Sequence, residues 1–161
     1  MYRVGQGWDV HPFDPARKLV LGGIEIPNPR GGLAGHSDGD VLVHAVASAL
    51  LGSLALGDLG QHFPDTDARW KGVSSLELLR HVVALVHERG FTLVNCDATV
   101  VAQEPRLAPF VAQIRDKLAQ VLDVTPDCVS VKSTTAEGLG ALGRAEGIAA
   151  HAIALVQRPD P

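Results

Sequence analysis

The sequence predicts an α/β fold of the α+β sandwich type. A mixed sheet of four main strands carries helices on one face, and a short hairpin lies beside it. Strand-like segments stand far apart in the chain, helical segments lie between them, and the last strand is apolar on both faces. Strands joined through helices pack most economically as one sheet with a helical layer.

The first half of the chain begins with a strand at residues 2–8 and a hairpin made by KLVLGG and IEIP, with Gly22-Gly23 as its turn. From residue 41, VLVHAVASALLGSLAL is apolar almost all round, which is typical of a buried helix, and the preceding HSDGD offers Ser and Asp as N-cap candidates. In SSLELLRHVVALVHERG, Ser74 and Glu77 have capping-box spacing and Gly90 is the helix stop.

The second half of the chain supplies three further strands and one helix. FTLVNCDATVVAQ and CVSVKST are the strands on either side of the amphipathic helix PFVAQIRDKLAQVLDV, and GIAAHAIALVQ is the last strand. The segments GDLGQHFPDTDARWKG and TAEGLGALGRAEG are expected to be loops. Because no repeat or linker interrupts this order, residues 1–161 are expected to form a single domain.

Composition excludes several classes of function. The chain has 161 residues, 46% hydrophobic content and a formal charge of -4, and it lacks a basic run interleaved with aromatic residues. Nucleic acid is therefore not an expected partner. If the chain binds an anionic small molecule, the positive charge must come from a few Arg and Lys residues, helix N-termini or bound cations.

The cysteines and the apolar segments indicate the cellular compartment in which the protein is expected. Cys96 and Cys128 are too few for a disulfide framework, so both are expected to be small buried residues in a reducing compartment. The N-terminus lacks the pattern of a signal peptide, and the longest apolar segment, residues 41–56, is short and interrupted by His44, Ser48, Gly52 and Ser53. A cytoplasmic protein that does not span a membrane is expected.

A metal site is the sharpest hypothesis from the residues alone. In GWDVHPF, Asp9 and His11 are two positions apart, so on a strand they point to the same face. His44 is the odd polar residue of the buried helix. One carboxylate and two imidazoles with an open position are the ligands of a catalytic zinc ion. Asp40 is an alternative ligand, or a group that orients an imidazole.

Three loop segments contain further candidates. In GHSDGD, His36 and Ser37 stand at a helix N-terminus, where donors favour a phosphate, although a capped turn explains most of the segment equally well. The loop GDLGQHFPDTD offers carboxylates and one apolar wall for sugar-like hydroxyls. In KSTTAEGLGALGR, threonines suit phosphate oxygens, Glu137 suits Mg²⁺ and Arg144 balances charge. His81, His87 and His151 are expected to be structural or solvated.

Taken together, five segments resemble the 2-C-methyl-D-erythritol 2,4-cyclodiphosphate synthase family almost from end to end: GWDVHPF, AGHSDGDVLVHA, ALGDLGQHFPDTD, NCDATVVAQEPRLAP and KSTTAEGLGALGRAEGIA. The resemblance implies a ferredoxin-like protomer in a homotrimer, with sites between subunits. It also implies conversion of 4-diphosphocytidyl-2-C-methyl-D-erythritol 2-phosphate into the cyclic diphosphate and CMP, on the non-mevalonate route to isoprenoids.

Residue roles carried over from the family follow the matching motifs. The resemblance makes Asp9, His11 and His44 the zinc ligands and leaves Asp40 outside the ligand set. It makes His36 and Thr135 the groups that stabilise the transition state, and Glu137 the ligand of Mg²⁺ or Mn²⁺. The substrate contacts that it implies are Asp9, His11, His36, Ser37, Asp58, Gly60, Phe63, Asp65, Asp67, Ala102, Pro105, Arg106, Leu107, Ala108, Thr134, Thr135, Glu137 and Arg144.

Two positions depart from the family pattern, and two other functions fit the same residues. Ala141 stands where Phe is usual, so Leu139 or Leu142 would have to supply an apolar wall, and Ala136 stands where a third threonine is common.

A zinc-dependent phosphohydrolase would use the same three ligands, with metal-bound water as the nucleophile. A non-catalytic trimeric metal-binding module is the other alternative.

Overall fold

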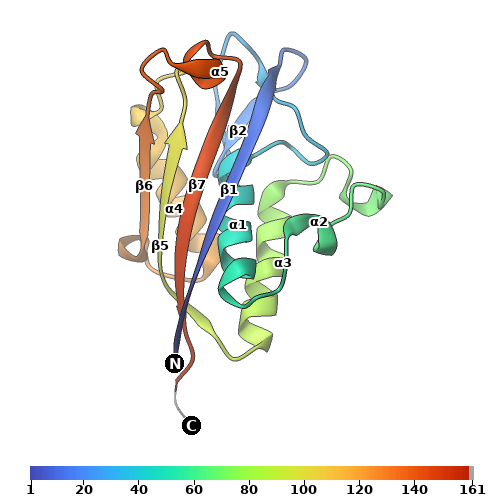
Figure 1. Ribbon diagram of the computed structural model, residues 1–161, viewed down its shortest axis with the longest axis vertical. Helices are drawn as coiled ribbons and strands as arrows, with labels where there is room; N and C mark the ends of the chain where they lie inside the picture. The colour runs from blue at the N-terminus through green and yellow to red at the C-terminus, as the bar shows by residue number, and fades with distance from the viewer. Residues whose placement is uncertain (160–161) are drawn as a thin grey trace.

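The computed structural model describes residues 1–159, which form a mixed five-stranded sheet and a separate hairpin (Figure 1). The strand order is β4-β1-β7-β5-β6, in which β5 and β6 are parallel and the other pairs are antiparallel. The bounds are β1 (Tyr2–Asp14), β2 (Leu19–Leu21), β3 (Ile24–Ile26), β4 (Gly32–Leu33), β5 (Thr92–Val101), β6 (Val129–Thr134) and β7 (Gly147–Gln157). The predicted fold class is confirmed, with the two-residue strand β4 added at one edge.

Three longer helices cover one face of the sheet. Helix α1 (Val41–Ser53) packs on β1 and β7, α4 (Val111–Leu122) packs beside β6, and α3 (Ser75–Glu88) lies against α1 and α4. The predicted loops contain two one-turn helices, α2 (Leu59–His62) and α5 (Gly140–Gly143). Short 3-10 helices occupy Ala68–Trp70, Ala108–Phe110 and Pro126–Cys128.

The helix termini explain where the main helices begin and end. Asp40 caps α1 by accepting a hydrogen bond from the Val43 amide at 3.1 Å. Ser74 caps α3, as predicted, but Glu77 pairs with Arg80 and does not reach back to close a capping box. Gly90 follows α3 with a φ of +75°, a left-handed conformation that favours glycine.

Two glycines of β1 set how closely α1 approaches the sheet. A Cβ atom on Gly5 would lie 2.1 Å from the Ala49 carbonyl oxygen, and one on Gly7 would lie 2.0 Å from the Ala45 carbonyl oxygen. Both distances are far below any allowed contact, so only glycine permits this packing. The close approach brings the strand that carries Asp9 directly against the helix that carries His44.

The other face of the sheet is open and partly apolar. Helices α1 and α4 lie behind the sheet in Figure 1, and within residues 1–159 no helix covers the front. Alternate residues of β1 point to this side, and several are large and exposed; Val4 is 66% and Trp8 57% exposed. We call this surface the open face and define it by Tyr2, Val4, Trp8 and Val10 of β1 and Ile153 of β7.

The two cysteines differ in burial. Cys96 is buried, and burial raises the pKa of its thiol to about 12. Cys128 is only partly buried, so the expectation of two buried cysteines is wrong for this residue, which lies at the end of a 3-10 turn before β6. Within residues 1–159, each helix is too short or too polar to cross a membrane.

Candidate active site

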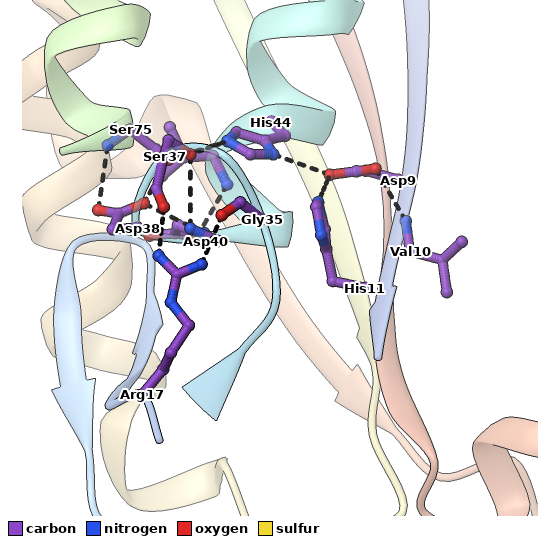
Figure 2. Close-up of polar contacts among 12 residues, drawn as sticks. Asp9, Val10, His11, Arg17, Gly35, Ser37, Asp38, Asp40, His44 and Ser75 are labelled. Carbon is purple, nitrogen blue, oxygen red and sulfur yellow. Dashed lines mark hydrogen bonds and ion pairs between the residues drawn. The ribbon is translucent and has the colours of Figure 1, made fainter. Parts of the chain in front are cut away.

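Asp9, His11 and His44 converge where β1 faces the start of α1, and we call them the metal triad. The Oδ2 atom of Asp9 lies 2.8 Å from His11 Nε2 and 2.9 Å from His44 Nδ1. One ligand atom from each residue lies within 4.8 Å of the others. Asp9 and His11 face the same side because they are two positions apart on β1, and Figure 2 shows His44 reaching them from α1.

The electrostatics of the metal triad suit a cation. Partial burial raises the pKa of the Asp9 carboxyl, but the hydrogen bonds with His11 and His44 outweigh this effect and hold it below its usual range. The hydrogen bond with Asp9 raises the pKa of His11, so a proton competes with a cation for this imidazole. A charged carboxylate and two imidazole nitrogens, with side chains only 13–26% exposed, form a donor set that zinc accepts while keeping one position for another ligand.

Asp40 is neither a ligand nor a partner of an imidazole. Its carboxylate accepts hydrogen bonds from the amides of Gly22 at 3.0 Å, Gly23 at 2.7 Å and Val43 at 3.1 Å. The hypothesis that Asp40 orients His44 is therefore wrong, because the N-cap geometry turns the side chain toward the β2–β3 turn. Complete burial raises the pKa of Asp40 to about 6, although the three amides oppose the shift.

Residues 34–40, which we call the histidine loop, are held by contacts with distant parts of the chain. The Arg17 guanidinium donates hydrogen bonds to the carbonyl oxygens of Gly35 and Ser37, on either side of His36 (Figure 2). The His36 carbonyl accepts from the Gly72 amide at 2.9 Å. His36 is thus held at the backbone while its side chain remains exposed.

A cavity of about 360 Å³ opens in front of the metal triad. On its polar side it is lined by the metal triad together with predicted substrate contacts: His36, Ser37, Asp58 and Gly60. Its apolar side consists of Trp8, Leu59, Phe63, Trp70 and Leu78. We call it the first cavity, and its mixed lining suits a small ligand with both anionic and hydrocarbon parts.

Two predicted contacts from the same segment lie outside the lining of the first cavity. Asp65 is exposed, and Asp67 accepts hydrogen bonds from the Arg69 amide and guanidinium. The bonds with Arg69 lower the pKa of Asp67. Asp58, which does line the cavity, also caps α2 through the Gln61 amide at 2.9 Å.

A second cavity of about 500 Å³ lies where β5 and β6 end. It is lined by Gln103 and Ser133 and by predicted contacts that follow the two strands: Ala102, Pro105, Arg106, Leu107, Ala108, Thr134, Thr135 and Glu137. Glu137 has a φ of +51°, unusual for a residue with a side chain. The Thr135 hydroxyl donates to its carboxylate at 2.9 Å and accepts from its amide at 3.2 Å.

Most of the predicted site residues line one of the two cavities, and the two linings share no residue. The metal triad and His36 line the first cavity, whereas Thr135 and Glu137 line the second. Arg144 belongs to neither and pairs with Glu146 at 2.6 Å. One chain therefore presents two separate groups of candidate residues, on strands β1 and β6 with β7 and β5 between them.

Some residues at the site were not predicted. Ser48 lines the first cavity one helical turn after His44, so helical spacing was a usable signal for it. Trp70 packs edge-on against Phe63, with ring centroids 5.0 Å apart, and extends the apolar wall. Arg17 and Ser75 contact the histidine loop from other elements, and no local pattern in the sequence marks either one.

The fold and the metal triad together define an α/β enzyme with a candidate mononuclear metal centre at the mouth of a cavity. A family model described as the YgbB family matches residues 2–157, and the chain belongs to this family. Curated relatives over nearly the whole chain are named as 2-C-methyl-D-erythritol 2,4-cyclodiphosphate synthases, so the chain is an enzyme of the lyase class.

Three comparisons illustrate the similarity. The synthase of Geobacter metallireducens is 56% identical over 97% of this chain and 99% of its own. The bifunctional IspDF of Campylobacter jejuni superposes with a TM-score of 0.94 at 42% identity, over 99% of this chain and 43% of that longer chain. A synthase solved in a CDP-bound form has a TM-score of 0.89 and 37% identity, over 96% of this chain and all of its own.

Proposed function

We propose that the enzyme converts 4-diphosphocytidyl-2-C-methyl-D-erythritol 2-phosphate into 2-C-methyl-D-erythritol 2,4-cyclodiphosphate in isoprenoid precursor biosynthesis. An oxygen of the substrate's 2-phosphate attacks the β-phosphorus of its CDP group. A new P–O bond closes the ring as the bond from the β-phosphorus to the bridging oxygen breaks, and CMP leaves with the electron pair. Water is not consumed, and no protein nucleophile is needed.

The first cavity would hold the phosphate that attacks. Asp9, His11 and His44 would bind zinc, whose chemistry here is to orient the 2-phosphate and withdraw charge from it. His36 and Ser37 would contact the same phosphate, and the apolar wall that contains Phe63 would face the hydrocarbon part of the erythritol. Intramolecular positioning of this kind is worth roughly 7–11 kcal/mol, so a strong acid or base is dispensable.

The second cavity would hold the CDP group. Ala102 and Pro105–Ala108 would surround the cytosine, Glu137 would hold Mg²⁺ or Mn²⁺ on the diphosphate, and Thr134, Thr135 and Arg144 would support the phosphates. The CDP-bound relative supports a nucleotide ligand for this family. Ala136 and Ala141 offer less than the usual side chains, and Leu139, which is 74% exposed, is available as the substitute wall.

One observation carries the reaction: a carboxylate and two imidazoles meet at the wall of a cavity in a member of this synthase family. The test is incubation with the substrate in ¹⁸O-labelled water, following CMP and the cyclic product by ³¹P NMR and mass spectrometry. We expect both products in equal amounts, no label in either, and loss of both when zinc is chelated. Label in the product would indicate the alternative, a zinc phosphohydrolase.

We also propose a homotrimer whose sites lie between subunits. Two features support it. The open face exposes apolar side chains that a neighbouring subunit would cover. In addition, one chain places His36 and Thr135, which would act on one transition state, in separate cavities. Facing subunits would bring the first cavity of one against the second cavity of the next.

Mixing two impaired variants, assayed at a Mg²⁺ concentration that limits Glu137→Gln, tests this arrangement. Asp9→Asn removes the metal half of the site, and Glu137→Gln weakens the nucleotide half. After dissociation and reassembly of an equal mixture, sites between subunits would be intact in about one quarter of cases, because each half comes from a different chain. Sites within one chain would give no gain in activity. Sedimentation equilibrium measures the assembly, expected at three times the 17.0-kDa chain.

Two further expectations remain predictions: that residues 1–161 act as a single domain, and that the enzyme works in the cytoplasm. Limited proteolysis that yields no stable fragment would support the first, and cell fractionation tests the second.

A further inference from the structure

The two ring nitrogens of His44 lie in different surroundings. Nδ1 faces Asp9 at 2.9 Å, on the side where the metal triad converges. Nε2 points into the protein and lies 2.9 Å from the Ser75 hydroxyl and 3.0 Å from the Ser37 hydroxyl. When Nδ1 serves as a metal ligand, the ring proton must reside on Nε2. That proton is then buried and requires an acceptor.

The contacts of Ser75 decide what its hydroxyl can do. Ser75 is the first residue of α3 and is fully buried. Its hydroxyl donates to the Asp38 carboxylate, which can only accept, and its amide donates to the same carboxylate at 3.0 Å (Figure 2). Because its single proton is used by Asp38, the Ser75 oxygen is available to His44 only as an acceptor.

Ser37 does not replace Ser75 in this role. Its hydroxyl lies 3.0 Å from the Ser75 oxygen and accepts a long bond, 3.4 Å, from the Gly39 amide. The hydroxyl proton of Ser37 therefore has an acceptor in the Ser75 oxygen, and the Ser37 oxygen already accepts the bond from Gly39. The Asp38 carboxylate, by contrast, accepts two hydrogen bonds from Ser75, one from its amide and one from its hydroxyl.

We propose that Ser75, fixed by Asp38, is a positioning residue that accepts the Nε2 proton of His44 and so aims the Nδ1 lone pair at the metal position. Residues from three segments combine here: His44 on α1, Asp38 in the histidine loop and Ser75 on α3. This inference rests on the proposed zinc site. Partners of this kind, which orient a ligating histidine, change metal affinity by roughly 10- to 100-fold when removed.

The test compares Ser75→Ala with Ser74→Ala, which removes the adjacent hydroxyl and a cap of the same helix without touching His44. We measure the zinc dissociation constant by competition with a chromophoric chelator. Because Ser37 remains near Nε2, we expect Ser75→Ala to bind zinc about tenfold more weakly than Ser74→Ala, at the low end of that range. Equal constants would overturn the inference. Absence of zinc binding by the wild-type protein would instead overturn the proposed zinc site.

A second measurement needs no variant. In the zinc-loaded wild-type protein, the Nε2 proton of His44 should give a downfield imidazole resonance in ¹⁵N-edited NMR spectra, protected from exchange with water. A proton that exchanges at the rate of a free imidazole would contradict the hydrogen bond to Ser75.

Discussion

The two halves of the candidate site are built in different ways. The metal triad stands on β1 and α1, elements held at contact distance by Gly5 and Gly7, and its side chains are largely buried. The nucleotide half consists of segments that follow β5 and β6. In this half, which lines the second cavity and is proposed to bind the nucleotide, Thr135 and Glu137 are exposed and bond mainly to each other.

The fold of one chain thus fixes the positions of the metal triad, whereas the positions of Thr135 and Glu137 depend more on assembly or on a bound ligand. Ligand atoms of a metal must converge within a few ångströms, which requires rigid elements and buried partners. A diphosphate with its own cation can be gathered by an exposed loop, because the ligand itself supplies part of the organisation. Variants that alter one half, compared with controls that alter neither, test this difference.

The largest effect is expected from His44→Ala, which breaks the metal half. Loss of a ligand should exceed the loss of an orienting partner, so we expect CMP release to fall by at least about 100-fold, with loss of bound zinc. His87→Ala, which changes an exposed histidine of α3, is the matched control. Zinc content and CMP release are measured together with sedimentation. Full activity with His44→Ala would contradict the ligand assignment.

Glu137→Gln should affect only the nucleotide half. Removing one carboxylate charge is expected to raise the Mg²⁺ concentration needed for half-maximal rate by about tenfold, equivalent to about 1.4 kcal/mol, while zinc content stays unchanged. Glu25→Gln, an exposed change on the hairpin, is the control. An unaltered Mg²⁺ requirement would argue against this role for Glu137.

Gly7→Ala tests whether the close contact between β1 and α1 holds the residues of the metal triad in position. The added Cβ would collide with the Ala45 carbonyl, so we expect destabilisation of about 1–3 kcal/mol, together with weaker zinc binding as β1 and α1 separate. Gly52→Ala is the control, because its Cβ would meet the nearest atom at an ordinary 3.5 Å. Within a helix that change should be neutral or stabilise by up to about 1 kcal/mol. Urea unfolding distinguishes the two variants.

The last prediction concerns pH and Asp40. Burial raises the pKa of this carboxyl in the folded protein from 3.8 to about 6. Its contribution to stability is therefore complete below pH 3.8 and declines as the pH rises through about 6, because the charged form is disfavoured in the fold. The unfolding free energy of the wild type minus that of Asp40→Asn should decrease from pH 4 to pH 7. An increase would refute the direction of the shift.

Local patterns predicted the fold well wherever periodicity was strong. The last strand was predicted at 147–157 and is observed as Gly147–Gln157. The first strand was predicted to end at residue 8 but continues to Asp14. Asp9 and Pro12 are poor strand formers, and pairing with β7 overrides that preference. The one-turn helices α2 and α5 carry too few residues for any periodic signal.

The candidate site was predictable where spacing or resemblance pointed to it. Asp9 and His11 share a face by the period of a strand, but only the tertiary structure shows that His44 meets them. Asp40 is a residue type that often binds metals, yet its carboxylate accepts hydrogen bonds from backbone amides instead. Ser75 contacts His44 and Asp38 from 31 and 37 residues away, a separation across which no sequence pattern operates.

The anchoring of the histidine loop has a consequence for conformational entropy. The loop is tied to β1, the β1–β2 loop, the hairpin turn, the segment before α3 and the start of α3: Ala34 to Pro12, Gly35 and Ser37 to Arg17, His36 to Gly72, Asp38 to Val73 and Ser75, and Asp40 to Gly22 and Gly23. If a phosphate binds at His36 as proposed, it would order little more than that one side chain, at a cost of roughly 0.5–1.5 kcal/mol. Little of the free energy of those contacts would therefore be spent on ordering the loop itself.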